Sequence, residues 1–318
     1  MSTYPELYLH IKTMNILGLV CCDCLQDASK RLDIDCCSSH ERKAKTKLFI
    51  VLLTCFSTLI YCCICIQDFH IGIFNEIGNH HLILVFACSS LMISCFYVYF
   101  YATRSRNIAF LKDIFHYYND ICEQGEASAK SCRRQYFLYA QISLLSLLVC
   151  ISSFVQAVEM WTAKVSLIVI HFSFTMVVGV IISLYVSIVR MIMLTMKHLN
   201  AQLCDCTNKG YDCANLRNLQ HIIERRNRLL VICYKDLNRR FGLMLLLTFA
   251  YIILMAPSGP YLIIVRLLRL HIDKDVWTII LPTVVSSFWS IPWIVIFAMM
   301  SKCGGLTTEV SNQSKKEN

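Results

Sequence analysis

Residues Leu216–Tyr251 read LRNLQHIIERRNRLLVICYKDLNRRFGLMLLLTFAY. The first half of this stretch alternates apolar and charged residues at helical spacing, and the second half is almost wholly apolar. Glu224 precedes Arg228 by four residues, a spacing that favours a helix. The first proline after the stretch is Pro257, so the pattern predicts one helix over 214–255, roughly 60 Å long at about 1.5 Å per residue. The apolar core of a bilayer is about 30 Å thick, so half of the helix is expected to project from the membrane.

The composition of the chain is that of a membrane protein. The 318 residues are 56% hydrophobic and 16% charged, which lies outside the range of soluble globular domains. We therefore expect an all-α, polytopic membrane helix bundle with six spans, the fifth of them extended into the cytoplasm. The predicted spans are residues 46–66, 80–102, 135–157, 164–193, 241–268 and 276–300.

The distribution of Lys and Arg predicts the orientation in the membrane. These residues are concentrated before the first span, after the second and fourth spans and in the tail, and few lie in the opposite loops. By the positive-inside rule, both termini are cytoplasmic. Contact with the anionic inner leaflet of the bilayer then accounts for the net charge of +9, so no nucleic acid partner is needed. The predicted units are a cytoplasmic N-terminal segment (1–45), spans one to four (46–195), a cytoplasmic stalk (196–240), spans five and six (241–301) and a cytoplasmic tail (302–318).

The nineteen cysteines do not predict a disulfide framework, because the predicted outer loops contain none. The thiols lie in spans or on the cytosolic side, where they stay reduced. The spacing of Cys21, Cys22, Cys24, Cys36 and Cys37 is compatible with zinc, but adjacent pairs make awkward ligand sets. Burial or palmitoylation is the competing interpretation, and we predict no metal site.

Polar side chains and broken helices predict a ligand site in the outer half of the bundle. Gln156 and His171 lie at membrane depth, where polar groups face protein or water. The sequence APSGP at 256–260 cannot continue a regular helix and so suggests a cavity wall. Trp277 and Trp293 are interpreted as interfacial belt residues. The candidate ligand-binding residues are Gln156, His171, Tyr251, Tyr261 and Trp289.

Motifs for catalysis are missing from the sequence. There is no phosphate-binding glycine loop, no HExxH helix and no GxSxG turn. Ion-coupled transporters carry Asp or Glu in the middle of a span, and no predicted span of this chain does. We therefore expect neither an enzyme nor a cofactor, but a binding protein or channel that responds to an uncharged or weakly polar molecule.

Two segments resemble the insect gustatory receptor family, the seven-helix ligand-gated cation channels related to insect odorant receptors. Residues 198–242, with HLNAQL and LRNLQHIIERRNRLLVICYKDLNRRFG, resemble the end of the family's fourth helix and its long fifth helix. Residues 288–310, FWSIPWIVIFAMMSKCGGLTTEV, resemble its sixth helix and the link that follows, with Cys303 and Glu309 placed as in the family. The sequence ILGL at 16–19 is a weaker match.

The resemblance implies a receptor subunit that detects a small tastant at the plasma membrane of a sensory neuron, in its dendrite. It also implies a homo- or hetero-tetramer with related receptors, in which the stalk is the anchor between subunits. We expect exposed apolar surface at Leu219, Ile223 and Leu230 in a lone chain. The predicted anchor residues are Leu219, Ile223, Leu230 and Leu237.

The sequence departs from the family at its end. Family members carry a TYxxxxxQF-type signature on a seventh, pore-lining helix, and this chain has no such motif. The expectation is therefore a chain that lacks the last helix, for which an accessory or truncated subunit, or a non-channel membrane protein, is the alternative to a complete channel. A G-protein-coupled receptor is disfavoured, because that class has its N-terminus outside.

Overall fold

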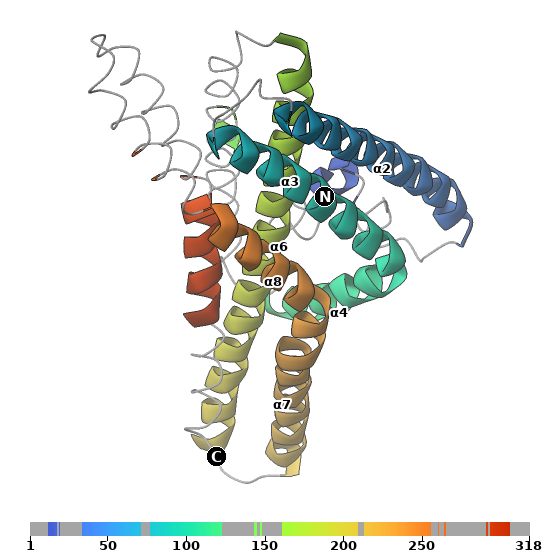
Figure 1. The fold of residues 1–318 in the computed structure, drawn as a ribbon. Coiled ribbons are helices and arrows are strands. Elements are labelled where there is room, and N and C mark those ends of the chain that lie inside the picture. Colours follow the sequence, from blue (N-terminus) through green and yellow to red (C-terminus); the bar gives the residue numbers. More distant parts are fainter. Residues whose placement is uncertain are drawn as a thin grey trace.

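The structure is a computed structural model, and its described residues form helices only, which confirms the predicted all-α class (Figure 1). Described are residues 12–17, 34–70, 77–122, 161–208, 213–255 and 293–305, with a few isolated positions. The elements are α2 (Ile34–His70), α3 (Ile77–Ala102), α4 (Arg104–Cys122), α6 (Trp161–Asn208), α7 (Cys213–Val231), the π-helix η2 (Ile232–Leu237), α8 (Asn238–Met255) and a shorter apolar helix, Trp293–Gly305.

Within the described ranges, four helical stretches are long and apolar enough to cross a membrane. They correspond to the predicted first, second, fourth and fifth spans. Most of the predicted third span lies outside the described residues. The same holds for most of the C-terminal part of the fifth span and of the N-terminal part of the sixth. The four stretches are Glu41–Ile64, Leu84–Ala102, Ser173–Cys206 and Leu216–Leu254.

Helix α6 is the centre of the bundle, and α2 lies at its edge (Figure 1). In the most apolar part of α6, 72% of the residues are buried, compared with 17% in α2. Helix α6 packs against α2, α3, α4, α7 and α8. The outward face of α2 suits contact with lipid, because it is a continuous row of exposed apolar side chains: Phe49, Ile50, Leu53, Phe56, Ile60 and Ile64.

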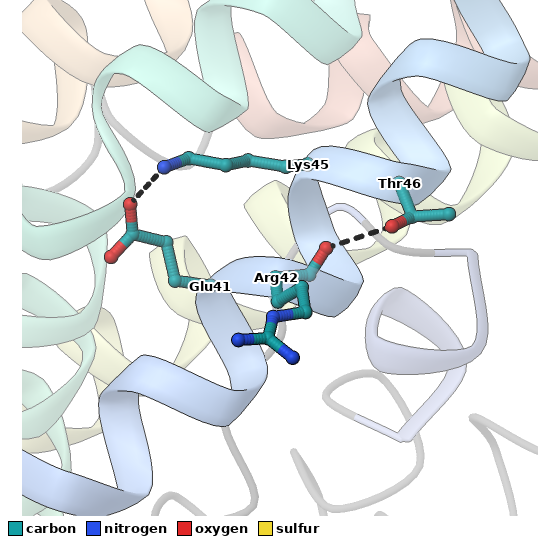
Figure 2. A network of polar contacts seen from close by, with 4 residues as sticks. All are labelled: Glu41, Arg42, Lys45 and Thr46. Atoms are coloured by element: carbon teal, nitrogen blue, oxygen red, sulfur yellow. Dashed lines mark hydrogen bonds and ion pairs between the residues drawn. The ribbon is translucent and has the colours of Figure 1, made fainter.

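The N-terminal end of α2 extends beyond the predicted span. Lys45 Nζ lies 2.7 Å from Glu41 Oε1, and Thr46 Oγ1 donates a hydrogen bond of 3.0 Å to the carbonyl of Arg42 (Figure 2). Glu41 stands four residues N-terminal to Lys45, the favourable order on a helix. Side chains of this kind prefer water, so the first turns of α2 are suited to an aqueous surface of the membrane.

A short helix at residues 12–17 is attached to α2 and α3. Lys47 Nζ donates to the carbonyls of Asn15 and Ile16, at 3.0 and 3.1 Å. The Tyr97 hydroxyl donates to the carbonyl of Leu17 at 2.6 Å. These bonds satisfy carbonyls that the end of a helix leaves without intrahelical partners. Met14 is completely buried, so this part of the N-terminal segment belongs to the core of the bundle.

The stalk is a helical hairpin. Helix α6 continues past the predicted end of span four to Asn208, and α7 returns beside it (Figure 1). Helices α7, η2 and α8 follow one another without a break, which confirms the predicted continuity over 214–255. A fully regular helix was nevertheless the wrong expectation, because η2 interrupts the α-helical hydrogen-bonding pattern.

The cause of the π-helix is visible in the spacing of buried residues. Leu229, Cys233, Leu237 and Phe241 are all buried and follow one another in three steps of four residues. An α-helix has 3.6 residues per turn, so such a row drifts around a regular helix. A π-turn absorbs the extra residue and keeps all four side chains on the buried face.

Candidate functional site

Three aromatic rings from three helices meet inside the bundle. Phe174 of α6 and Tyr251 of α8 have ring centroids 4.7 Å apart at an interplanar angle of 73°. Trp293 lies 4.7 Å from Tyr251 and 5.6 Å from Phe174. All three side chains are buried. Edge-to-face and tilted ring pairs of this kind stabilise by more than the area they bury, so the three rings join α6, α8 and helix 293–305.

A buried hydrogen bond connects these rings to α3. Ser89 Oγ lies 2.7 Å from the Tyr251 hydroxyl, and it also donates to the carbonyl of Val85 at 2.8 Å. A serine hydroxyl has one proton to donate. Because that proton goes to Val85, the Tyr251 hydroxyl is the donor to Ser89. We call Ser89, Phe174, Tyr251 and Trp293 the aromatic cluster.

The aromatic cluster is polar but uncharged. It carries a hydroxyl pair and an indole N–H among aromatic rings, and the other buried polar side chains of these helices are hydroxyls as well. Ser90, next to Ser89, is also fully buried, and within the described part of the chain its Oγ has no hydrogen-bond partner. Such surroundings match an apolar or aromatic molecule with one or two hydrogen-bonding groups and disfavour an ion.

One of the five predicted ligand-binding residues, Tyr251, is a member of the aromatic cluster. His171 lies on α6 three residues before Phe174, a spacing that places both on the same side of the helix. The side chain of His171 is outside the described part of the structure, as are Gln156, Tyr261 and Trp289 altogether.

The sequence analysis missed three members of the aromatic cluster. Trp293 is only 2% exposed and packs on Tyr251, so its interpretation as a belt residue was wrong. Ser89 has a signal in the sequence, because Ser89 and Ser90 interrupt an apolar span. Phe174 has none, since a phenylalanine in a membrane span is ordinary.

A second group of largely buried side chains lies toward the stalk and comes from α6, η2, α8 and helix 293–305. The rings of Tyr185 and Phe241 are 5.6 Å apart, and Cys233 and Cys303 both lie near Tyr185. Cys303 is fully buried, and this burial raises the pKa of its thiol to about 11. A thiol with so high a pKa is chemically inert, so Cys303 serves packing.

The stalk presents apolar side chains on its surface. Leu216 and Ile223 on α7 are 47% and 41% exposed, and Val231 and Tyr234 are exposed farther along. Of the four predicted anchor residues, Ile223 is exposed, Leu219 and Leu230 are half-buried, and Leu237 is buried in the core of the chain itself. The buried face of α7 instead contains Ile222, Arg226 and Leu229.

The described residues include no group of three or more His, Cys, Asp or Glu side chains arranged to hold a metal ion. Cys21, Cys22 and Cys24 lie outside the described residues, as do the side chains of Cys36 and Cys37.

Comparison with known proteins gives the family. The profile of the 7tm chemosensory receptor family matches residues 7–317. The chain is 26% identical over 316 residues to gustatory and pheromone receptor 39a, isoform A, of Drosophila melanogaster, covering 98% of this chain and 79% of that protein. It is 24% identical over 326 residues to isoform D, covering 99% and 80%. No solved structure matches significantly. The family match spans nearly the whole chain, which confirms the resemblance seen in residues 198–242 and 288–310: this protein belongs to the insect 7tm chemosensory receptor family.

Proposed function

We propose that this protein is a gustatory receptor subunit of the ligand-gated cation channel type, and that it detects a small, uncharged tastant. The observation that carries the proposal is the aromatic cluster, which joins four helices through rings and one hydroxyl pair. Two of its relatives are named as gustatory and pheromone receptors, which fits detection of a small molecule.

The aromatic cluster offers a direct route from binding to movement. A ligand that packs between the rings replaces contacts of Tyr251 with Phe174 and Trp293, and so changes how α8 sits against α6. Such a ligand favours whichever arrangement of the helices it binds more tightly. Opening of a cation pathway follows if that arrangement is the conducting one.

A calcium reporter in transfected insect cells tests this proposal, with sucrose and caffeine as uncharged probes, with and without co-expressed relatives. We expect a response that Tyr251→Phe weakens at least about threefold in half-maximal concentration, since a lost hydrogen bond is worth about 1 kcal/mol. Ile253→Ala is the matched control, because Ile253 lies on the same helix but is exposed on the surface of the bundle, outside the aromatic cluster. Silence of the wild type under every condition contradicts the receptor proposal.

The proposed location is the plasma membrane of a sensory neuron, with both termini in the cytoplasm. The charged first turns of α2 and the charged helix α7 support this orientation, because both belong on the side rich in Lys and Arg. An N-terminal glycosylation tag tests it. Modification of the tag would reverse the topology and revive the G-protein-coupled alternative.

The stalk supports assembly with other copies or with related receptors, as a homo- or hetero-tetramer. Exposed apolar residues on a cytoplasmic helix cannot be covered by lipid, so a protein partner is the natural cover. An accessory subunit that only assembles, without conducting, uses the same surface. Recording currents from the chain alone and beside a co-expressed relative separates these two functions.

A further inference from the structure

The corner between α3 and α4 is bonded to the first turn of α8. The Tyr99 hydroxyl, at the end of α3, lies 3.2 Å from the carbonyl of Arg239 and 3.0 Å from that of Arg240. These carbonyls also belong to the turn in which the π-helix gives way to α8. The hydroxyl of a single tyrosine thus holds the backbone of α8 at the point where its hydrogen-bonding pattern changes.

The side chain of Arg240 makes the return contact to α4. Its Nη1 donates to Asn107 Oδ1 at 3.1 Å, and its guanidinium carbon lies 4.6 Å from the centroid of the Phe110 ring. Asn107 and Phe110 are both buried. A guanidinium that lies over an aromatic face and bonds an amide oxygen is fixed in position, and its positive charge is stabilised.

Asn107 is itself oriented by the corner. Its Nδ2 donates to Thr103 Oγ1 at 2.9 Å, which leaves Oδ1 for Arg240. Thr103 Oγ1 in turn donates to the carbonyl of Tyr99 at 2.7 Å. Tyr99, Thr103 and Asn107 are spaced four apart along a nearly continuous helical backbone, so they form one edge. We call this edge together with Arg240 the corner clamp.

The electrostatic surroundings of Arg240 agree with this arrangement. Burial lowers the pKa of the guanidinium, whereas Asp236 of η2 and Asp113 of α4 raise it. Arginine remains charged in proteins despite such burial. Acidic groups on η2 and α4 therefore offset part of the effect of burial on this cation. Arg239, its neighbour, is exposed, and only its carbonyl takes part in the corner clamp.

We propose that Arg240 is a positioning residue that couples movement of α8 to the α3–α4 corner, so that a ligand acting at Tyr251 is sensed by α4 through the corner clamp. The coupling to a ligand rests on the function proposed above. Arg240 and Tyr251 share one helix and lie roughly 16 Å apart along it, three turns, a length over which a helix moves as a rigid rod.

Hydrogen exchange on the purified full chain in nanodiscs tests the clamp without any ligand. Arg240→Gln and Asn107→Ala are each expected to speed exchange of the amides in the first two turns of α4 by at least about tenfold, the effect of roughly 1.4 kcal/mol in local opening. The double variant is expected to exchange no faster than either single one, because both remove the same contact. Arg239→Gln is the matched control and should exchange as the wild type does.

Two exchange results overturn the clamp: unchanged exchange of α4 in Arg240→Gln, or an equal effect of Arg239→Gln. Tyr99→Phe keeps the fold of the corner and removes only the hydroxyl, so it replaces Arg240→Gln if that variant does not fold. It is expected to speed exchange in the same turns of α4.

Calcium responses to sucrose and caffeine test the coupling. At equal surface amounts, Arg240→Gln is expected to lower the maximal response and Arg240→Lys to restore part of it, whereas Arg239→Gln leaves it unchanged. A purely structural role would change the surface amount and not the response per receptor, and that result overturns the coupling. If the wild type responds to neither probe, the proposed function fails, and hydrogen exchange alone decides the clamp.

Discussion

At the scale of single residues, the Tyr251 hydroxyl is a buried polar group that depends on a single partner among the described residues. It is buried, and Ser89 is its acceptor. Ser89 has a second bond, to the carbonyl of Val85, whereas Tyr251 makes no other hydrogen bond within the described part of the chain. Loss of the bond between them therefore leaves Ser89 with a partner and the Tyr251 hydroxyl without one among the described residues.

This asymmetry predicts the order of two substitutions. Ser89→Ala leaves the Tyr251 hydroxyl buried without an acceptor and is expected to cost about 1–3 kcal/mol of stability. Tyr251→Phe removes the donor and leaves Ser89 bonded to Val85, so it costs less. Thermal unfolding of both variants in the same detergent measures the difference. A larger loss for Tyr251→Phe would contradict the assignment of donor and acceptor.

Cysteine reactivity gives a second prediction for single residues. Burial raises the pKa of Cys303 to about 11, which leaves roughly one thiol in a thousand ionised at pH 8. Cys204, on the exposed end of α6, is the comparison. Iodoacetamide at pH 8 is expected to modify Cys204 and spare Cys303, as read by peptide mass spectrometry, with Cys303 modified only after unfolding. Equal labelling of both in the folded protein would show that Cys303 is accessible.

The residues of the aromatic cluster show what a sequence can reveal at this scale. Tyr251 was among the residues predicted to line a cavity, a prediction that rested on the broken outer halves of the spans and on their lack of charge. Trp293 was misplaced because tryptophans near span ends usually lie at the interface, and only the neighbouring helices determine that this one turns inward. Which side of a membrane helix faces protein is not written in its hydrophobicity, since lipid and protein are both apolar.

At the scale of elements, the π-helix η2 decides how the stalk is joined to the membrane part. The three steps of four residues from Leu229 to Phe241 were legible in the sequence, but only the burial of Cys233 shows that this row is the one facing inward. Of the predicted anchor residues, Leu237 lies on this buried row, whereas Ile223 is exposed instead. An amphipathic helix with apolar residues on two faces leaves that choice open.

Deleting one residue of η2 tests its role. Removal of Lys235, which is exposed, is expected to restore regular α-helix and to rotate α7 against α8 by about 100°. Ile222 and Leu229 then leave the face that packs on α6, and the stalk hairpin loses stability. The loss of stability is measured by limited proteolysis, in which the link between α6 and α7 is expected to be cleaved faster than in the wild type. Lys235→Ala keeps the residue count and serves as the control, and equal cleavage of both variants would argue against a register role for η2.

Helix α6 shows the limit of span prediction from hydropathy. The predicted span ended at 193, but the helix continues to Asn208 because no proline or glycine follows before Gly210. Leu199 is buried beyond that point, so packing against α7 extends the helix. The predicted stalk of 196–240 is consequently a hairpin of two helices, in which the end of the fourth helix, recognised in HLNAQL at 198–203, packs beside α7.

At the scale of the whole molecule, apolar runs predicted where the helices lie, and charge predicted which ends share a side. Neither pattern determines assembly, because assembly depends on how the exposed surface of one chain fits that of a second chain. The outer face of α2 and the exposed face of α7 both carry exposed apolar side chains, yet they are suited to different neighbours. Lipid can cover Phe49 and Phe56, while Ile223 lies among charged residues such as Glu224 and Arg225.

That contrast leads to a prediction on assembly. Ile223→Glu places a charge in the proposed contact between subunits and is expected to convert an oligomer into a monomer while the helix content stays unchanged. Asn227→Glu adds the same charge at a neighbouring exposed position and is expected to leave the oligomer intact. Leu237→Glu buries a charge within the chain and is expected to prevent folding instead. Native mass spectrometry of the three variants in detergent separates these outcomes. A wild type that is monomeric, or an Ile223→Glu variant that keeps its oligomer, would remove α7 as the contact and leave the apolar faces in the membrane as the remaining surface for assembly.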